Sequence, residues 1–195
     1  MSARILPPAF EPPGNRYTRA EVARMEESGG LSGRWELIDG QLVNKVGQNP
    51  PHPYVLRFVA AWLARIYGPE RISHQSPIEV AVVDQERNEP QPDIAVIAET
   101  GQEHLRRHPR GDELLLLVEV ADSSAWFDLK IKAPLYARAG VPEYWVVNIQ
   151  RRMIVVHRQP ENGCYLQIEE IGAGESVSSG EARALVSELI PEASQ

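Results

Sequence analysis

The run LLLLVEV, from Leu114 to Val120, is the most apolar stretch of the chain, and it carries one acid, Glu119, between two valines. A run this apolar predicts a strand that is buried on both faces of a sheet. An ionised carboxylate is costly in such a place unless a cation or a proton meets it. Glu119 is therefore the first candidate for a functional residue.

The sequence on either side of this run predicts the rest of a sheet. Residues 93–98 form a second expected strand, which Asp93 opens directly after Pro92. Residues 128–139 have the pattern of a helix, and Gly140 is placed to terminate it. Three further strands are expected at residues 143–148, 153–158 and 165–171.

The remaining elements are helices, a hairpin and loops. Thr18 and Glu21 match the capping box that starts a helix, and Asp39-Gly40 between apolar runs predicts a β-hairpin. Apolar residues between positions 54 and 67 recur at the helical period, so we expect the main core helix there. We further expect a proline-rich loop at 49–53, a strand at 77–83 and a closing helix at 181–189. This order predicts an α+β fold, a mixed β-sheet flanked by helices.

The composition is that of an ordinary soluble globular protein. Of its 195 residues, 43% are hydrophobic and 24% are charged. The formal net charge of −7 argues against non-specific coating of nucleic acid but leaves room for one local basic groove. The chain has no P-loop, dinucleotide fingerprint, nucleophile elbow or zinc-protease motif.

Cysteine content and hydropathy indicate the compartment. The single cysteine, Cys164, excludes an internal disulfide and a cysteine-based zinc site, which fits a cytoplasmic protein. No apolar stretch approaches the roughly 18 residues that a membrane helix needs. Residues 1–16 are rich in proline and are expected to form an extended arm. With no repeat or linker beyond it, residues 17–195 are expected to be one domain.

Asp93 and Glu119 together suggest two carboxylates that converge on Mg²⁺ or Mn²⁺. Mg²⁺ prefers oxygen ligands and usually keeps several waters. Such an ion can polarise a phosphoryl group and lower the pKa of a bound water. For Asp93 alone the structural alternative is the stronger one, because an aspartate at a strand start can simply satisfy nearby backbone donors.

A lysine on the expected helix 128–139 is the third member of the candidate site. Lys130 and Lys132 point to different faces, so one of them is expected to be a solvated surface residue. Asp128, Lys132 and Tyr136 recur every four residues and line one face, which can point at the sheet end that carries Glu119.

Pro134 complicates this helix. Proline is tolerated in the first turn of a helix and disrupts later turns. The regular helix is therefore expected to begin near residues 130–131, which places Lys132 in its first turn.

Several other polar residues keep two interpretations. Glu36 is either a solvent-facing residue of the hairpin or an additional acid near the metal, and His52 is more readily a surface residue than a catalytic one. A basic cluster in the segment 100–111 is either a solvated face or a phosphate contact. Trp126 and Phe127 suit the core or an interface better than base stacking. The cluster consists of Arg106, Arg107, His108 and Arg110.

At these residues the chain resembles the Uma-two-like restriction endonuclease family of the PD-(D/E)XK nuclease superfamily. The matching segments are residues 35–40, 91–96, 118–124 and, most specifically, 128–145. The resemblance covers roughly residues 17–171, most of the chain, and implies a restriction-endonuclease-like fold.

The resemblance implies that Asp93 and Glu119 hold the metal. The usual lysine of the superfamily lies two residues after the glutamate, where this chain has Ala121. In this family the lysine appears on the following helix, at the position of Lys132. Pro134 suits the family pattern, and Asn148 stands where the family often has aspartate, a change expected to affect packing rather than chemistry.

These observations predict a Mg²⁺- or Mn²⁺-dependent endonuclease that hydrolyses phosphodiester bonds, with DNA as the expected substrate and a homodimer as the expected assembly. Lys132 is expected to orient the attacking water or stabilise negative charge. Glu36 would hold a water on the metal, and Tyr136 would position Lys132. The alternative is a catalytically silent module of the same fold that binds nucleic acid or protein, which the acidic net charge favours.

Overall fold

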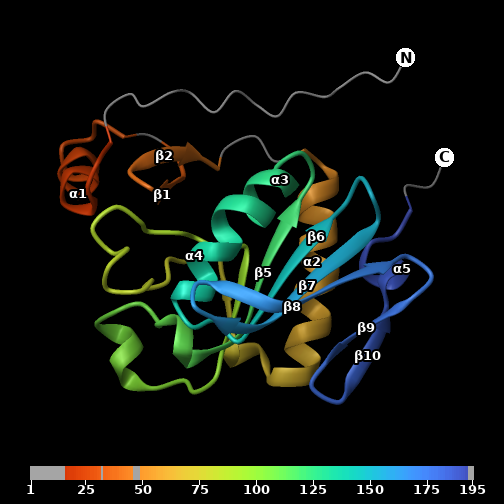
Figure 1. Cartoon of the computed structure of the whole chain (residues 1–195). Coiled ribbons are helices and arrows are strands. Elements are labelled where there is room, and N and C mark those ends of the chain that lie inside the picture. Colours follow the sequence, from red (N-terminus) through yellow and green to blue (C-terminus); the bar gives the residue numbers. More distant parts are fainter. Residues whose placement is uncertain (1–15, 32, 46–48, 193–195) are drawn as a thin grey trace.

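A six-stranded mixed sheet forms the centre of the protein (Figure 1). The computed structural model describes residues 16–31, 33–45 and 49–192. Neighbouring strands are antiparallel except β5 and β6, which are parallel, so the predicted mixed sheet is confirmed. In spatial order the strands are β3 (Ile72–His74), β4 (Ile94–Ile97), β5 (Leu114–Ala121), β6 (Glu143–Asn148), β7 (Met153–Glu161) and β8 (Cys164–Gly172).

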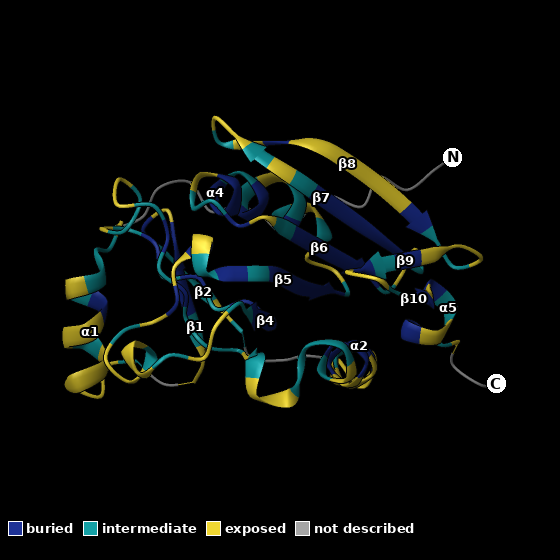
Figure 2. Cartoon of the chain, turned by 90° about the horizontal axis from the view of Figure 1, so that it is seen from below, coloured by how far each residue is buried: buried dark blue, intermediate teal, exposed yellow. Residues whose placement is uncertain are grey.

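Strand β5 lies inside the sheet, and its side chains point alternately to two interiors, as in any strand. Leu116 and Val118 belong to an apolar cluster that also contains residues of helix α2 (Pro51–Tyr67). Leu117 and Ala121 belong to a second cluster with residues of helix α4 (Ala133–Arg138). Seen along the edge of the sheet, α2 and α4 cover opposite faces (Figure 2). The predicted burial of β5 on both faces is confirmed.

The helical segment after β5 differs from the prediction. It begins with α3 (Ala125–Phe127), continues as a π-helical turn, η4 (Asp128–Lys132), and ends as α4. The expected start near residues 130–131 is wrong, because the wider turn accommodates the proline. The Ala133 N–H bonds to the Asp128 carbonyl, five residues back, just before Pro134, which has no N–H to donate.

The N-terminal elements follow the sequence closely. Helix α1 (Arg19–Glu27) begins with the predicted capping box at Thr18. Strands β1 (Trp35–Ile38) and β2 (Gln41–Asn44) form the predicted hairpin. Its turn places Asp39 at φ 48° and Gly40 at φ 76°, the left-handed conformation that an Asp-Gly hairpin turn requires.

Four other expectations need correction. Helix α2 begins at Pro51 rather than after the proline-rich loop, because prolines are tolerated in a first turn. Residues 77–83 form only one isolated bridge, between Glu79 and Arg110. Strand β3 was not expected. The closing helix is shorter, because residues 182–185 pair in a hairpin, β9 (Ser176–Ser179) with β10 (Ala182–Leu185), before α5 (Val186–Leu189).

Three short 3₁₀ turns complete the described elements: η1 (Pro69–Arg71), η2 (Gln102–Leu105) and η3 (Gly111–Glu113). The predicted N-terminal arm lies outside the described residues apart from Arg16. Among the helices that the structure describes, none is long and apolar enough to cross a membrane.

Candidate active site

Four elements bring five charged side chains into one buried cluster at the end of β5. Glu36 comes from β1, Asp93 directly precedes β4, and Glu119 is on β5. Asp128 and Lys132 come from the π-helical turn η4. Each of these five residues is no more than 3% exposed. The solvent-facing alternative for Glu36 is therefore wrong.

Sheet register brings the two candidate metal ligands together. Ile94 of β4 pairs with Val118 of β5, so Asp93 and Glu119 come at the same end of two adjacent antiparallel strands. The backbone N–H of Val120 donates to Asp93 Oδ2 over 2.9 Å. Asp93 thus satisfies a backbone donor, as its structural alternative predicted, but it does so with only one of its two carboxylate oxygens.

Lys132 is the common partner of three acids. Its Nζ lies 2.7 Å from Glu36 Oε1, 2.9 Å from Glu119 Oε1 and 3.7 Å from Asp128 Oδ1. Burial by itself lowers the pKa of Lys132, but attraction to these carboxylates outweighs it, so the pKa lies well above its usual value. Lys132 is therefore a permanently charged buried cation, while Lys130 is exposed on the surface.

Tyr136 completes the hydrogen bonding of Glu119. Its hydroxyl donates to Glu119 Oε1 over 2.9 Å, the same oxygen that Lys132 contacts. Burial and the negative charge of Glu119 raise the pKa of Tyr136 well above its usual value, so the hydroxyl stays protonated and remains a donor. The expected shared face of Asp128, Lys132 and Tyr136 is confirmed by these contacts.

The two candidate metal ligands have opposite electrostatics. Burial raises the pKa of Asp93, but the hydrogen bond from His52 and the charge of Lys45 outweigh it and hold the pKa well below its usual range. Burial raises the pKa of Glu119 above its usual value despite the lysines nearby. Burial also raises the pKa of Asp128 to about 7. Asp93 is thus the acid most firmly kept ionised.

His52 and Lys45 adjoin the candidate ligands, although the sequence favoured a surface position for His52 and did not mark Lys45. His52 lies in the first turn of α2, is 8% exposed and donates from Nε2 to Asp93 Oδ2 over 3.2 Å. The expectation of a surface histidine is wrong because α2 starts earlier than predicted. Lys45 follows β2, whose Val43 pairs with Glu36, and its Nζ approaches both Asp93 and Glu119. That hairpin register is the signal that could have found it, since residues two apart on a strand share a face.

A pocket opens onto this cluster. Its inner wall includes Lys45, Asp93 and Glu119. At its rim, Asn49 Nδ2 donates to Asp122 Oδ2 over 2.9 Å. The charged groups are thus buried yet adjoin a cavity that polar side chains border.

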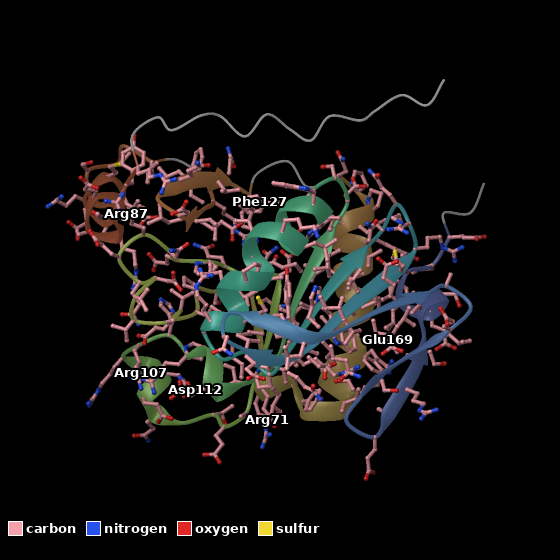
Figure 3. All side chains as sticks on the ribbon, viewed as in Figure 1. Arg71, Arg87, Arg107, Asp112, Phe127 and Glu169 are labelled. Atoms are coloured by element: carbon pink, nitrogen blue, oxygen red, sulfur yellow. The ribbon has the colours of Figure 1, made fainter. Side chains whose placement is uncertain are left out.

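The basic cluster of the segment 100–111 is remote from this pocket. Phe127 lines the pocket, and Figure 3 shows Arg107 at the opposite end of the molecule. Both terminal nitrogens of Arg107 donate to the carboxylate of Glu113, and Arg110 lies 3.5 Å from Glu79. Two of these cations are therefore matched by acids, and the cluster does not border the candidate site.

The donor set fits a hard divalent ion. Asp93 Oδ1 is buried without a hydrogen-bond partner among the described residues, and the surrounding acceptors are carboxylate oxygens, which Mg²⁺ prefers. Within the same described part of the chain, no three His, Cys, Asp or Glu side chains are arranged as a complete metal site. A Mg²⁺ site needs only one or two carboxylates beside water and substrate, so the pair is sufficient.

Comparison with known proteins identifies the family and agrees with this fold. The model of the Uma2 family, described as "Putative restriction endonuclease", matches residues 19–187. A crystal structure of "a putative nuclease belonging to DUF820 from Anabaena variabilis ATCC 29413" superposes with a TM-score of 0.62. It shares 13% sequence identity, over 85% of this chain and 96% of that chain, a level at which the likeness shows the fold. A search of the curated proteins finds no significant match.

Proposed function

Because the chain belongs to the Uma2 family, whose model covers most of its length, we propose that it is a nuclease that hydrolyses phosphodiester bonds of DNA with Mg²⁺ or Mn²⁺. One observation carries the proposal. Asp93 and Glu119 are buried side by side at the ends of β4 and β5, and Asp93 keeps one oxygen without a hydrogen-bond partner among the described residues. A buried acceptor left without a partner is costly unless a cation serves it.

Asp93 and Glu119 would hold the metal. When bound there, the ion would supply Lewis-acid polarisation of the phosphoryl group and a lowered pKa for a water. His52 is a positioning residue, because it and the Val120 N–H fix Asp93 Oδ2, while Oδ1 has no hydrogen-bond partner among the described residues and would be available to an ion. Hydrogen bonds from neighbouring groups fix the orientation of carboxylates that bind a metal.

Lys132 would stabilise the negative charge that develops on the phosphoryl group. A preorganised cation in a site that excludes water is effective because no solvent has to reorganise during the reaction. Glu36 and Glu119 hold its ammonium at 2.7 and 2.9 Å. Tyr136 shares the Glu119 oxygen and so fixes the acid that orients the lysine. Glu36 Oε2 also accepts from the Gln91 N–H, which ties β1 to the loop before Asp93.

A second candidate function has a specific observation in its favour. Lys45 already places a positive charge beside Asp93 and Glu119. A module that binds nucleic acid without cleaving it would need no metal, because this ammonium satisfies the acids. The two functions differ in whether the acids bind a divalent ion.

Cleavage of mixed substrates tests the proposal directly. Supercoiled plasmid, linear duplex and single-stranded RNA are incubated with the protein in Mg²⁺ or Mn²⁺, beside Asp93→Asn purified in the same way. We expect wild-type cleavage of DNA and none by Asp93→Asn, with circular dichroism verifying that the variant folds. Equal cleavage by both proteins, or none by either in both metals, contradicts the nuclease; binding without cleavage supports the silent module.

We also propose a single domain over residues 17–195 and a homodimer. Trp126 is 49% exposed, and strand β8, at the edge of the sheet, exposes Leu166 and Ile168 at 63% and 59%. Exposed apolar residues on an edge strand suit a two-fold contact. Light scattering of the wild type and of Leu166→Lys with Ile168→Lys tests the contact, and a wild-type monomer at all working concentrations contradicts it.

A further inference from the structure

We propose that Lys45 is a resident counter-cation at the metal position, so that divalent metal binds by exchange for its ammonium. This inference rests on the proposed function, since it assigns the metal to Asp93 and Glu119. It adds that the chain carries its own competitor for that metal.

The position of the Lys45 ammonium is the first observation. Its Nζ lies 3.6 Å from Glu119 Oε2, 3.7 Å from Asp93 Oδ1 and 3.9 Å from Glu36 Oε2. Asp93 Oδ1 is also the buried oxygen that lacks a hydrogen-bond partner among the described residues. One cation therefore stands between the oxygens expected to bind a metal.

The looseness of this contact is the second observation. Charge-assisted N–H···O bonds are typically 2.7–2.9 Å long, as Lys132 shows with Glu36 and Glu119. Among the described residues, the only bond this short from Lys45 goes to a neutral group, the Gln91 carbonyl, at 2.6 Å. Lys45 thus neutralises the acids by proximity, without the hydrogen bonds that would fix it to them.

Accessibility separates the two lysines in the same way. Both lysines line the pocket, but the Lys132 side chain is 2% exposed, at the end of the π-helical turn, whereas the Lys45 side chain is 10% exposed. Its flexible four-carbon stem can carry the ammonium toward the pocket mouth without moving the backbone. Lys132 is therefore the fixed cation of the site, and Lys45 is the cation that a metal ion would displace.

Charge explains why exchange of the ammonium for a divalent ion is favourable and why it weakens the apparent affinity for that ion. A divalent ion brings one more positive charge to the acids than the ammonium that it displaces, so exchange relieves more of their mutual repulsion. The Lys45 ammonium and a divalent ion cannot both lie between Asp93 and Glu119, because two positive charges so close together repel strongly in a buried site. The metal must therefore displace an ammonium, and its apparent affinity falls by the cost of doing so.

Calorimetric titration with Mn²⁺ in the absence of nucleic acid tests the exchange. Lys45→Met keeps the length of the side chain and removes the charge, and Lys45→Arg keeps the charge. We expect Lys45→Met to bind Mn²⁺ with a Kd lower by about tenfold or more, the scale of a single close charge interaction. Lys45→Arg should bind no more tightly than wild type. The control Lys130→Met removes an exposed lysine and should leave the Kd unchanged.

Melting temperature gives a second measurement on the same proteins. Without metal, Lys45→Met should melt below wild type, because its acids lose a counter-cation; with saturating Mn²⁺ its melting temperature should rise by more than that of wild type. Asp93→Asn should abolish Mn²⁺ binding in both backgrounds. If wild type and Lys45→Met bind Mn²⁺ equally and Asp93→Asn abolishes it, the metal site stands and the exchange is wrong. If no protein binds Mn²⁺, both the exchange and the proposed function are wrong.

Discussion

The two faces of strand β5 bury neighbouring residues in opposite environments. Val118 packs among the apolar side chains beneath α2, while Glu119, the next residue, meets Lys132 and Tyr136 beneath the helical layer on the other face. Both residues are at most 2% exposed. Burial alone therefore does not distinguish the apolar face from the face that carries the candidate site. The difference lies in whether the buried groups depend on a charged partner.

The largest expected effect is on stability, when the cation shared by the buried acids of the polar face is removed. Lys132→Met leaves Glu36, Glu119 and Asp128 without their shared cation, so the free energy of unfolding near neutral pH should fall by about 3–5 kcal/mol. Urea denaturation measures it, with Lys130→Met as the matched control because Lys130 is exposed. The control should change stability by less than about 0.5 kcal/mol. Equal effects of the two substitutions would break the distinction between the faces.

On the apolar face, a cavity should cost nearly as much but respond differently to pH. Leu63 is fully buried beneath the sheet, and Leu63→Ala should lower the free energy of unfolding by about 3 kcal/mol. That cost should be the same at pH 5 and pH 8, because the residues that pack in this cluster are hydrophobic and do not change charge between these pH values. Denaturation at both pH values measures this, and a cost that varied with pH would show that the faces are coupled.

This contrast explains how much the sequence could predict. The apolar periodicity of β5 and α2 is a local pattern and correctly indicated the sheet and its core helix. Glu119 stood out because it interrupts that pattern. Asp93 could be paired with it as an acid at a strand start, but their adjacency follows from the register of β4 against β5, which is a long-range property.

Residues outside these patterns could not be assigned. His52 was placed in a loop because three nearby prolines suggested one, although proline is also accepted in a first helical turn. Lys45 follows a short hairpin strand, and its position beside Asp93 depends on how that hairpin packs against the sheet. The sequence shows that Pro134 conflicts with a regular helix in this segment. It does not show that the chain accommodates the proline by forming a π-helical turn, which positions Lys132.

Acidity should alter stability through the polar face with a defined sign. The folded pKa of Asp128 is about 7, above its ordinary unfolded value near 4, so the folded protein binds more protons than the unfolded chain between those pH values. Stability from this group is therefore lost as the pH rises from about 4 to 7, by at most about 1.4 kcal/mol per pH unit. Asp93, whose pKa is lowered, acts in the opposite direction and only below about pH 4.

Asp128→Asn isolates the contribution of Asp128 to this slope. The variant should lose less stability than wild type between pH 5 and 7, and some slope should remain because the pKa of Glu119 is also raised. Urea denaturation at half-unit pH steps gives both curves. Parallel curves for the two proteins would mean that Asp128 does not titrate in this range.

The smallest expected effect is on the salt dependence of DNA binding, and it concerns the exposed surface of helix α2. Helix α2 starts at the pocket with His52 and contains no Asp or Glu, and its exposed Arg57 and Arg65 have no ion pair with any described residue. Each arginine that contacts a phosphate contributes about 0.9 to the slope of log K against log salt concentration. Arg57→Ala with Arg65→Ala should therefore reduce that slope for duplex DNA by up to about 2, measured by fluorescence anisotropy in Ca²⁺.

Arg107→Ala is the informative comparison for this surface. Its guanidinium is already bound by Glu113 at the end of the molecule remote from the pocket, so its removal should leave the slope nearly unchanged. If Arg107→Ala reduced the slope while the α2 variant did not, DNA would approach the far end of the molecule. The polar cluster would then lie away from the bound phosphates. Helix α2 would then serve the site through His52 alone, and its exposed arginines would have no part in guiding DNA to the pocket.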